Sequence, residues 1–196
     1  MTAGARTIGS VVGKALVGIF FVCYPVLVWL GLSNRSPRYL AGMLLCVVLP
    51  VAAFRMARSR RAGLRGLAWA PLVTVMGLLL SATLDAAGFM LVVPVAINAI
   101  FLVVFVTSLR SGAMPMVERF ARLQRSDLSS EQKVWCRLWT VIWSWFFVAN
   151  GTTALVLAVA APLAWWAAYN GLIAYMLMAC LFACEWTVRR RRFSRG

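Results

Sequence analysis

The residues of this sequence that could bind a ligand or another helix are polar side chains and a tryptophan placed inside apolar runs. Three of them are amides, Asn98, Asn150 and Asn170, and Trp143 lies about two helical turns before Asn150. An amide that faced lipid would be costly, so each should face another helix. We expect these amides to form contacts between helices. The alternative is that they and Trp143 line one groove for an amphiphile.

Charged residues gather in the only long polar segment, residues 110–137. Glu118 and Arg122 are four residues apart and can form an ion pair on one face of a helix. In a segment that lies in the membrane interface, the arginines would be near lipid phosphates. Arg119, Arg122 and Arg137 are therefore candidates for contact with lipid phosphates, with the acidic group of an amphiphile, or with a protein partner.

The residue types give little support for acid–base or metal chemistry. The chain has no histidine, and no second carboxylate accompanies Asp85 or Glu185, which lie at the ends of apolar runs. Glu185 stands four residues before Arg189 and can pair with it near the membrane surface. The five cysteines include no CxxC pair, and we expect those inside apolar runs to be structural. We predict no catalytic residue, metal or cofactor.

The elements that carry these residues are predicted to be membrane helices. Of the 196 residues, 63% are hydrophobic and 13% are charged, whereas a soluble protein has roughly 25% charged residues. The net charge of +15 would suggest nucleic acid binding on a folded surface, but the arginines occur in short blocks between apolar runs. This arrangement is typical of a membrane protein, and we expect no nucleic acid partner.

Six apolar runs are long enough to be candidate spans of a bilayer whose core is about 30 Å thick. They predict an all-α integral membrane protein with a single transmembrane domain. Asp85 and Gly88 form the turn of a tight hairpin between the third and fourth spans, and Pro162 marks the turn between the fifth and sixth. The predicted spans cover residues 11–32, 39–54, 67–84, 86–109, 138–161 and 163–188.

The distribution of lysine and arginine predicts the orientation of the six spans. Segments 55–65 and 110–137 hold five arginines each, the second also holds Lys133, and the tail after Val188 holds five more arginines. The opposite loops hold two arginines in all. Because basic loops stay on the cytoplasmic side, we expect both termini in the cytoplasm. The arginine-rich tail would also contact anionic phospholipids.

The polar segment before the fifth span is predicted to contain an amphipathic helix on the cytoplasmic membrane surface. It covers about residues 114–128 and can begin at Pro115. Ser129 and Gln132 have the spacing of a capping box, so the fifth helix should begin near Ser130. The apolar residues that recur at helical spacing in this segment are Met116, Val117, Phe120 and Leu123.

The second half of the chain carries a pattern that resembles a family of bacterial membrane proteins. The pattern starts with Pro115-Met116-Val117-Glu118-Arg119 and continues with Leu128, Trp135, Leu138, Trp143, Phe146, Phe147 and Gly151. Over roughly residues 90–190 it resembles the intracellular septation protein A family, known as IspZ or YciB. It is similar also to related uncharacterised inner-membrane proteins encoded with aryl polyene or fatty-acid-like biosynthesis genes. The resemblance implies an inner-membrane protein linked to septation, envelope integrity or lipid handling.

Three functions are compatible with these features. The first is a non-enzymatic scaffold that recruits membrane-protein partners of the envelope, or of a polyene or fatty-acid-like pathway, and that can form a homo-oligomer. The second is a transport or flipping component for a lipid or polyene-type amphiphile, in which the three amides and Trp143 line one groove. The third is an intramembrane acyl or glycosyl transferase with Glu118 or Asp85 as its base. The resemblance favours the scaffold, and the lack of histidine and of paired carboxylates places the transferase last.

Overall fold

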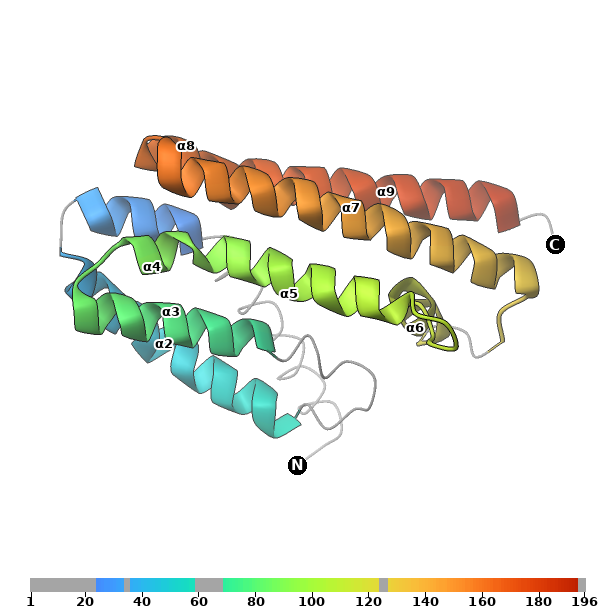
Figure 1. Ribbon diagram of the computed structural model, residues 1–196, viewed down its shortest axis with the longest axis horizontal. Coiled ribbons are helices and arrows are strands. Elements are labelled where there is room, and N and C mark those ends of the chain that lie inside the picture. The colour runs from blue at the N-terminus through green and yellow to red at the C-terminus, as the bar shows by residue number, and fades with distance from the viewer. Residues whose placement is uncertain (1–23, 34–35, 59–68, 124–126, 194–196) are drawn as a thin grey trace, which may run out of the picture.

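The computed structural model describes residues 24–33, 36–58, 69–123 and 127–193, and every regular element among them is helical (Figure 1). The all-α prediction is therefore confirmed for this part of the chain. The predicted first span before Tyr24 and residues 59–65 of the basic segment 55–65 lie outside the described residues. After a first helix, Tyr24–Ser33, the helices are α2 (Pro37–Arg58), α3 (Trp69–Leu84), α4 (Gly88–Leu91), α5 (Val93–Ser108), α6 (Met116–Arg122), α7 (Ser130–Ala160), α8 (Leu163–Ala168), the π-helix η2 (Tyr169–Ile173) and α9 (Ala174–Phe193).

Several of these helices have the length and composition of membrane spans. α7 has 31 residues, which at 1.5 Å per residue is about 46 Å, against about 30 Å for the core of a bilayer. The described residues contain three helices long and apolar enough to cross a membrane, Gly88–Ser108, Ser130–Ala160 and Leu163–Phe193. Shorter apolar helices overlap the first three predicted spans at Tyr24–Ser33, Pro37–Pro50 and Leu72–Leu84.

The predicted capping box at the start of α7 is present. Ser129 Oγ accepts a hydrogen bond from the backbone N–H of Gln132 at 3.2 Å, and Gln132 Oε1 accepts one from the N–H of Ser129 at 3.1 Å. The two bonds satisfy N–H groups that have no partner within the helix. α7 therefore begins about two turns before the predicted span 138–161, because its polar first turns are helical as well.

The turn between α3 and α4 also stabilises the start of α2. Asp85 adopts a left-handed conformation, with φ of 49°, which aspartate tolerates better than most residues. Its Oδ1 accepts a hydrogen bond from the backbone N–H of Arg38 at 2.8 Å, and Arg38 Nε donates to the carbonyl of Ala82 at 3.1 Å. The predicted hairpin turn is therefore present, and its carboxylate caps the first turn of another helix.

A break separates α4 from α5, and side chains of two other helices satisfy its carbonyl groups. Pro94 lies in the first turn of α5 and has no N–H, so it cannot donate to the carbonyl of Met90, four residues earlier, as a residue of a continuous helix would. Tyr24 Oη donates to Met90 O at 3.1 Å, and Trp166 Nε1 donates to Leu91 O, also at 3.1 Å. These bonds fix the first helix and α8 against the break.

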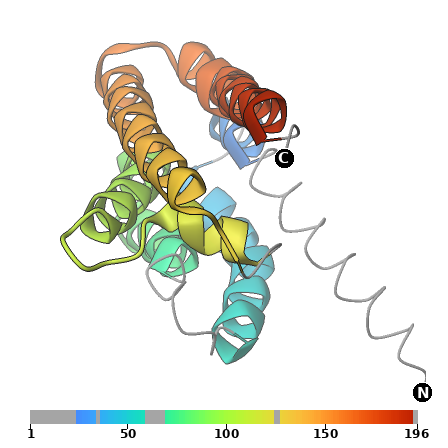
Figure 2. The same cartoon turned by 90° about the vertical axis from the view of Figure 1, so that its right-hand side faces the viewer.

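The turns between helices lie at two opposite ends of the bundle (Figure 1). The α3–α4 and α7–α8 turns and the start of α2 lie at one end, and α6, the start of α7 and the end of α9 lie at the other. α6 runs across the direction of the long helices, and α9 lies beside α7 (Figures 1 and 2). Two clusters of buried apolar side chains result, one around the α4–α5 break and one around the contact of α5, α6 and α7. The second cluster contains the candidate site.

Candidate functional site

Helix α6 is fixed by hydrogen bonds to the helices that precede and follow it. The backbone N–H of Met116 donates to Ser108 Oγ of α5 at 2.9 Å, and the N–H of Val117 donates to Thr140 Oγ1 of α7 at 3.2 Å. Both N–H groups belong to the first turn, where a helix offers no acceptor of its own. Two hydroxyl groups of neighbouring helices therefore cap α6, whose N-cap residue Pro115 forms no side-chain cap.

Two of the four apolar residues that recur at helical spacing in segment 114–128 pack against protein. Met116 and Val117 are buried in the cluster with α5 and α7, but Phe120 and Leu123 are 39% and 67% exposed. The helix also has seven residues, fewer than predicted. Because the bonds at its first turn set its orientation, α6 packs one side on protein and presents the other side outward.

The charged candidates around α6 have protein partners. Glu118 forms the predicted ion pair with Arg122, at 2.8 Å, and Glu118 is buried. Arg119 Nε and Arg137 Nη2 each donate to a backbone carbonyl between α5 and α6, at 3.0 and 2.7 Å. The Glu118–Arg122 pair thus lies within α6, Arg119 binds the loop before that helix, and Arg137 ties the same loop to α7.

Two of the three candidate amides form one chain of hydrogen bonds. Asn150 Nδ2 of α7 donates to Asn98 Oδ1 of α5 at 3.0 Å. Tyr169 Oη of η2 donates to Asn150 Oδ1 at 2.9 Å, and Asn98 Nδ2 donates to the carbonyl of Pro94 at 2.8 Å. Both amides are buried. The chain therefore joins three helical elements, with the amides as contacts between α5 and α7.

The third amide and Trp143 lie apart from this chain, which argues against the alternative of a single groove. Asn170 Nδ2 donates to the carbonyl of Trp166 in its own helix at 2.9 Å, so its amide is satisfied locally. Trp143 Nε1 donates to Glu185 instead. Only two of the four side chains contact each other, so the four do not line one groove.

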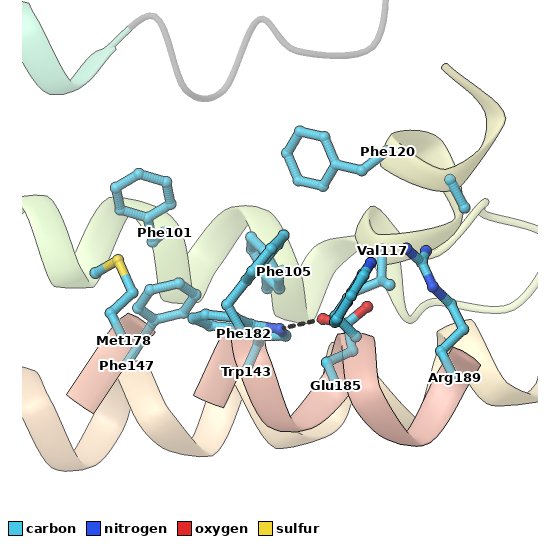
Figure 3. Close-up of a pocket in the computed structure, with 12 residues that line it drawn as sticks. Phe101, Phe105, Val117, Phe120, Trp143, Phe147, Met178, Phe182, Glu185 and Arg189 are labelled. Carbon is cyan, nitrogen blue, oxygen red and sulfur yellow. Dashed lines mark hydrogen bonds between the residues drawn. The ribbon is translucent and has the colours of Figure 1, made fainter. Parts of the chain in front are cut away.

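A cavity of about 250 Å³ lies between α5, α6, α7 and α9, and most of its wall is aromatic (Figure 3). Phe101 stacks on Phe147 with 5.2 Å between ring centroids, and Phe105 meets Phe147 edge to face at 5.1 Å. Such arrangements are favourable for aromatic rings and make this wall stiff. The residues that line the cavity are Phe101, Phe105, Val117, Phe120, Ala121, Trp143, Phe147, Met178, Phe182, Glu185, Trp186 and Arg189.

Trp143 and Glu185 form a polar contact in the wall of this cavity. Trp143 Nε1 donates to Glu185 Oε2 at 3.1 Å, and Glu185 is only 8% exposed (Figure 3). The predicted ion pair of Glu185 with Arg189 is absent, and the indole of Trp143 is the partner of the carboxylate instead. A buried carboxylate requires such hydrogen bonds. Arg189 lines the same cavity one turn further along α9.

Glu185 is the residue of this site whose partner was not predicted from the sequence, because it accepts a hydrogen bond from Trp143 instead of pairing with Arg189. Met178, Phe182, Glu185 and Arg189 are separated by four, three and four residues, and this spacing puts them on one face of a helix. All four line the cavity. The spacing in the sequence therefore indicates that these four residues share one face of α9. It does not indicate that Glu185 bonds to the indole of Trp143, because that contact depends on how α7 lies beside α9.

The charged groups in this part of the molecule include both signs, whereas the whole chain is strongly basic. Cys136, which is buried on α7, lies within electrostatic range of Glu118, Glu185, Arg122 and Arg189. These are two acidic and two basic groups, so their formal charges cancel, whereas the chain carries +15. Among the described side chains, no three of the His, Cys, Asp or Glu type are grouped so as to hold a metal ion.

No protein-family model matches the chain, and no curated protein or solved structure matches it. The fold and the site therefore define its class. In the part that the structure describes, it is an all-helical protein with three helices of membrane-spanning length and an aromatic cavity between four of its helices.

Proposed function

We propose that the chain crosses the bacterial inner membrane six times, with both termini in the cytoplasm. The arrangement of the turns supports this topology, because the α3–α4 and α7–α8 turns share one end of the bundle and α6 and the end of α9 share the other (Figure 1). The second end carries the described parts of the arginine-rich segments 110–137 and 189–195. By the positive-inside rule it is the cytoplasmic end. The resemblance to the septation protein A family supports the inner membrane as the location.

We propose that the protein is a non-enzymatic component of the envelope that binds a lipid or polyene-type amphiphile in the cavity between α5, α6, α7 and α9. The observation that carries this proposal is the cavity itself, which has aromatic walls and charged groups at one end. Small-molecule sites commonly have this composition, with apolar walls and a few placed polar groups. This cavity differs from the alternative groove considered for the three amides, because no amide lines it.

The size of the cavity limits what it holds. Its volume of about 250 Å³ lies below the range of roughly 300 to 1,000 Å³ that is usual for drug-sized ligands. We therefore expect it to hold one segment of a chain, while the rest of the amphiphile stays in the bilayer. Phe182 and Trp186 in its wall are 60% and 47% exposed, which gives a lipid chain lateral access.

Competition with the bilayer favours a stiff chain over a flexible one. Lipid tails are as apolar as the cavity, so the hydrophobic effect gives little net attraction for an acyl chain that leaves the bilayer. Aromatic contacts remain as a source of affinity, and flexible chains lose conformational freedom when they are held. A conjugated polyene or an aromatic tail has less freedom to lose. This argument supports the polyene-type ligand suggested by the resemblance.

A substitution that fills the cavity tests the proposal. Ala121 is buried on α6 and lines the cavity, so Ala121→Phe should occupy it. Native mass spectrometry of protein released from detergent, with lipid analysis of the retained species, should show at least about tenfold less bound amphiphile than wild type. Ala183→Phe, at an exposed position of α9 outside the cavity, is the matched control and should retain it. Equal retention by both variants would refute the proposal.

A scaffold function is the second candidate, and the outer side of α6 favours it. Because hydrogen bonds fix the first turn of this helix, its exposed Phe120 and Leu123 are presented in a defined orientation. A photo-crosslinking residue at Leu123 should then capture one membrane-protein partner or a second copy of the chain. The same residue at Val103, which is 60% exposed on α5, provides the control. Equal capture at both positions would argue against a docking surface on α6.

Transferase chemistry is the least supported candidate. Glu118, one of its two candidate bases, is paired with Arg122, and the other, Asp85, caps α2 through the N–H of Arg38. Both carboxylates therefore have structural partners, and neither lines the cavity. Incubation of the purified protein with lipid and acyl donors, followed by product analysis, tests this candidate directly.

A further inference from the structure

Two opposite charges line the aromatic cavity without pairing with each other. Glu185 and Arg189 are one helical turn apart on α9, at a spacing that normally favours an ion pair. In the structure, Glu185 binds the indole of Trp143, and Arg189 forms no salt bridge within the described residues. Figure 3 shows both side chains at the same end of the cavity, next to α6. A ligand at this end therefore meets a carboxylate and a guanidinium side by side.

The carboxylate retains capacity to accept a hydrogen bond. Glu185 Oε2 accepts from Trp143, and Oε1 has no hydrogen-bond donor among the described residues. A buried carboxylate is expensive unless it is paired and hydrogen bonded. An ammonium group of a ligand would supply both a charge and N–H donors. The rings of Trp143 and Trp186 in the same wall would add cation–π attraction.

The guanidinium next to it is suited to a phosphate. Arginine binds phosphate oxygens through its fork of N–H donors. Arg190 lies over the ring of Trp186, 5.1 Å from its centroid, and adds positive charge near this end of the cavity. The neighbouring Glu118 and Arg122 neutralise each other in their ion pair. Among the groups that line the cavity, the carboxylate of Glu185 and the guanidinium of Arg189 therefore remain to bind a ligand.

We propose that this end of the cavity binds the headgroup of a zwitterionic phospholipid with a primary ammonium, that is, a phosphoethanolamine headgroup. Glu185 binds the ammonium and Arg189 binds the phosphate. These charge-assisted contacts supply the affinity that an acyl chain between the aromatic rings would not gain by itself. This inference rests on the proposed amphiphile site and specifies its ligand. The apolar cavity wall favours a lipid as the source of the headgroup over free phosphoethanolamine.

Other common headgroups fit these two side chains less well. A phosphoglycerol headgroup offers Arg189 the same phosphate but leaves Glu185 opposite a neutral hydroxyl. A phosphocholine headgroup carries the positive charge but no N–H donor for Glu185 Oε1. A free fatty acid places a second carboxylate next to Glu185, which is repulsive. The charge pattern therefore selects phosphoethanolamine.

Lipid competition in native mass spectrometry tests this inference. The full-length protein in detergent is mixed with equal amounts of dioleoyl phosphatidylethanolamine and dioleoyl phosphatidylglycerol, and the retained lipids are counted. We expect wild type to prefer phosphatidylethanolamine by roughly tenfold or more, as a charge-assisted hydrogen bond would give. Glu185→Gln should abolish the preference while phosphatidylglycerol still binds. Arg189→Gln should weaken both lipids.

The matched control for the arginine is Arg191→Gln, which removes the same charge from an exposed position of the same helix and should leave both lipids unchanged. Equal retention of the two lipids by wild type, or an unchanged preference in Glu185→Gln, would overturn the headgroup assignment. In that case the amphiphile site would stand if Ala121→Phe still removed the bound lipid. A wild-type protein that retained no lipid above the Ala121→Phe level would overturn both proposals.

Discussion

The side chain of Asn98 lies directly over Gly151, the residue that follows its hydrogen-bond partner Asn150. A Cβ added to Gly151 would be 3.1 Å from Asn98 Cβ, and Asn150 Nδ2 donates to Asn98 Oδ1 at 3.0 Å. The glycine lets α5 and α7 approach closely enough for the two amides to meet. Small residues and amides commonly combine in this way where membrane helices pack.

Asn150→Leu should therefore destabilise the protein. The change leaves Asn98 Oδ1 and the hydroxyl of Tyr169 without their partners. Interhelical hydrogen bonds in membrane proteins average about 0.6 kcal/mol and reach about 1.7 kcal/mol, so losing two should cost about 1 to 2 kcal/mol. Unfolding in mixed micelles measures this, with the exposed Thr152→Leu as control. If both variants unfolded alike, the amide pair would contribute nothing.

Tyr24→Phe should cost about 1 kcal/mol, the usual net contribution of one hydrogen bond, because the carbonyl of Met90 then loses its side-chain donor. Pro94 cannot supply the backbone donor that a continuous helix would place at this carbonyl. In a Pro94→Ala background a backbone N–H becomes available, so the same Tyr24→Phe change should cost less. The two variants and their combination form a double-mutant cycle measured by unfolding in micelles. Strict additivity would show that the tyrosine does not act on the break.

Two glycines inside helices should respond oppositely to alanine. At Gly77 of α3 an added Cβ would lie 2.8 Å from Val93 Cγ2 and 3.1 Å from the carbonyl oxygen of Phe89, whereas at Gly42 of α2 nothing lies within 4 Å. Alanine favours a helix over glycine by about 1 kcal/mol. Gly42→Ala should therefore raise the unfolding midpoint, and Gly77→Ala should lower it because the backbone of α4 must move. A midpoint raised in both variants would mean that α3 and α4 are packed loosely.

The elements with local signals were predicted correctly from the sequence. Ser129 and Gln132 gave the start of α7 because a capping box depends only on residues three apart. The turn at Asp85 was recognised because it interrupts an apolar run. The ion pair of Glu118 with Arg122 follows from their spacing on one helix. In each case the partners are neighbours in the sequence.

The features that depend on which helices meet were not predictable in the same way. Spacing alone offered Glu185 a partner at Arg189, but the position of α9 beside α7 gives it the indole of Trp143, 42 residues away in the sequence. Asn170 lies inside an apolar run just as Asn150 does, yet its side chain donates to a carbonyl one turn earlier in its own helical segment. An apolar run in the sequence indicates that its residues are buried in protein or lipid. The run does not indicate which other helix each of these residues packs against.

The six-span topology predicts which insertion points face the cytoplasm. Reporters that are active only in the cytoplasm should work after Arg65, Arg125 and Gly196 and should be silent after Asp85 and Pro162. The physical reason is that the arginine-rich loops stay on the cytoplasmic side, whereas the loops at the other end hold only Arg35 and Arg38 among their basic residues. The opposite reporter, active only outside the cytoplasm, provides the control and should give the inverse pattern. Cytoplasmic activity after Asp85 would be incompatible with six spans, since it would put the α3–α4 turn on the same side as α6.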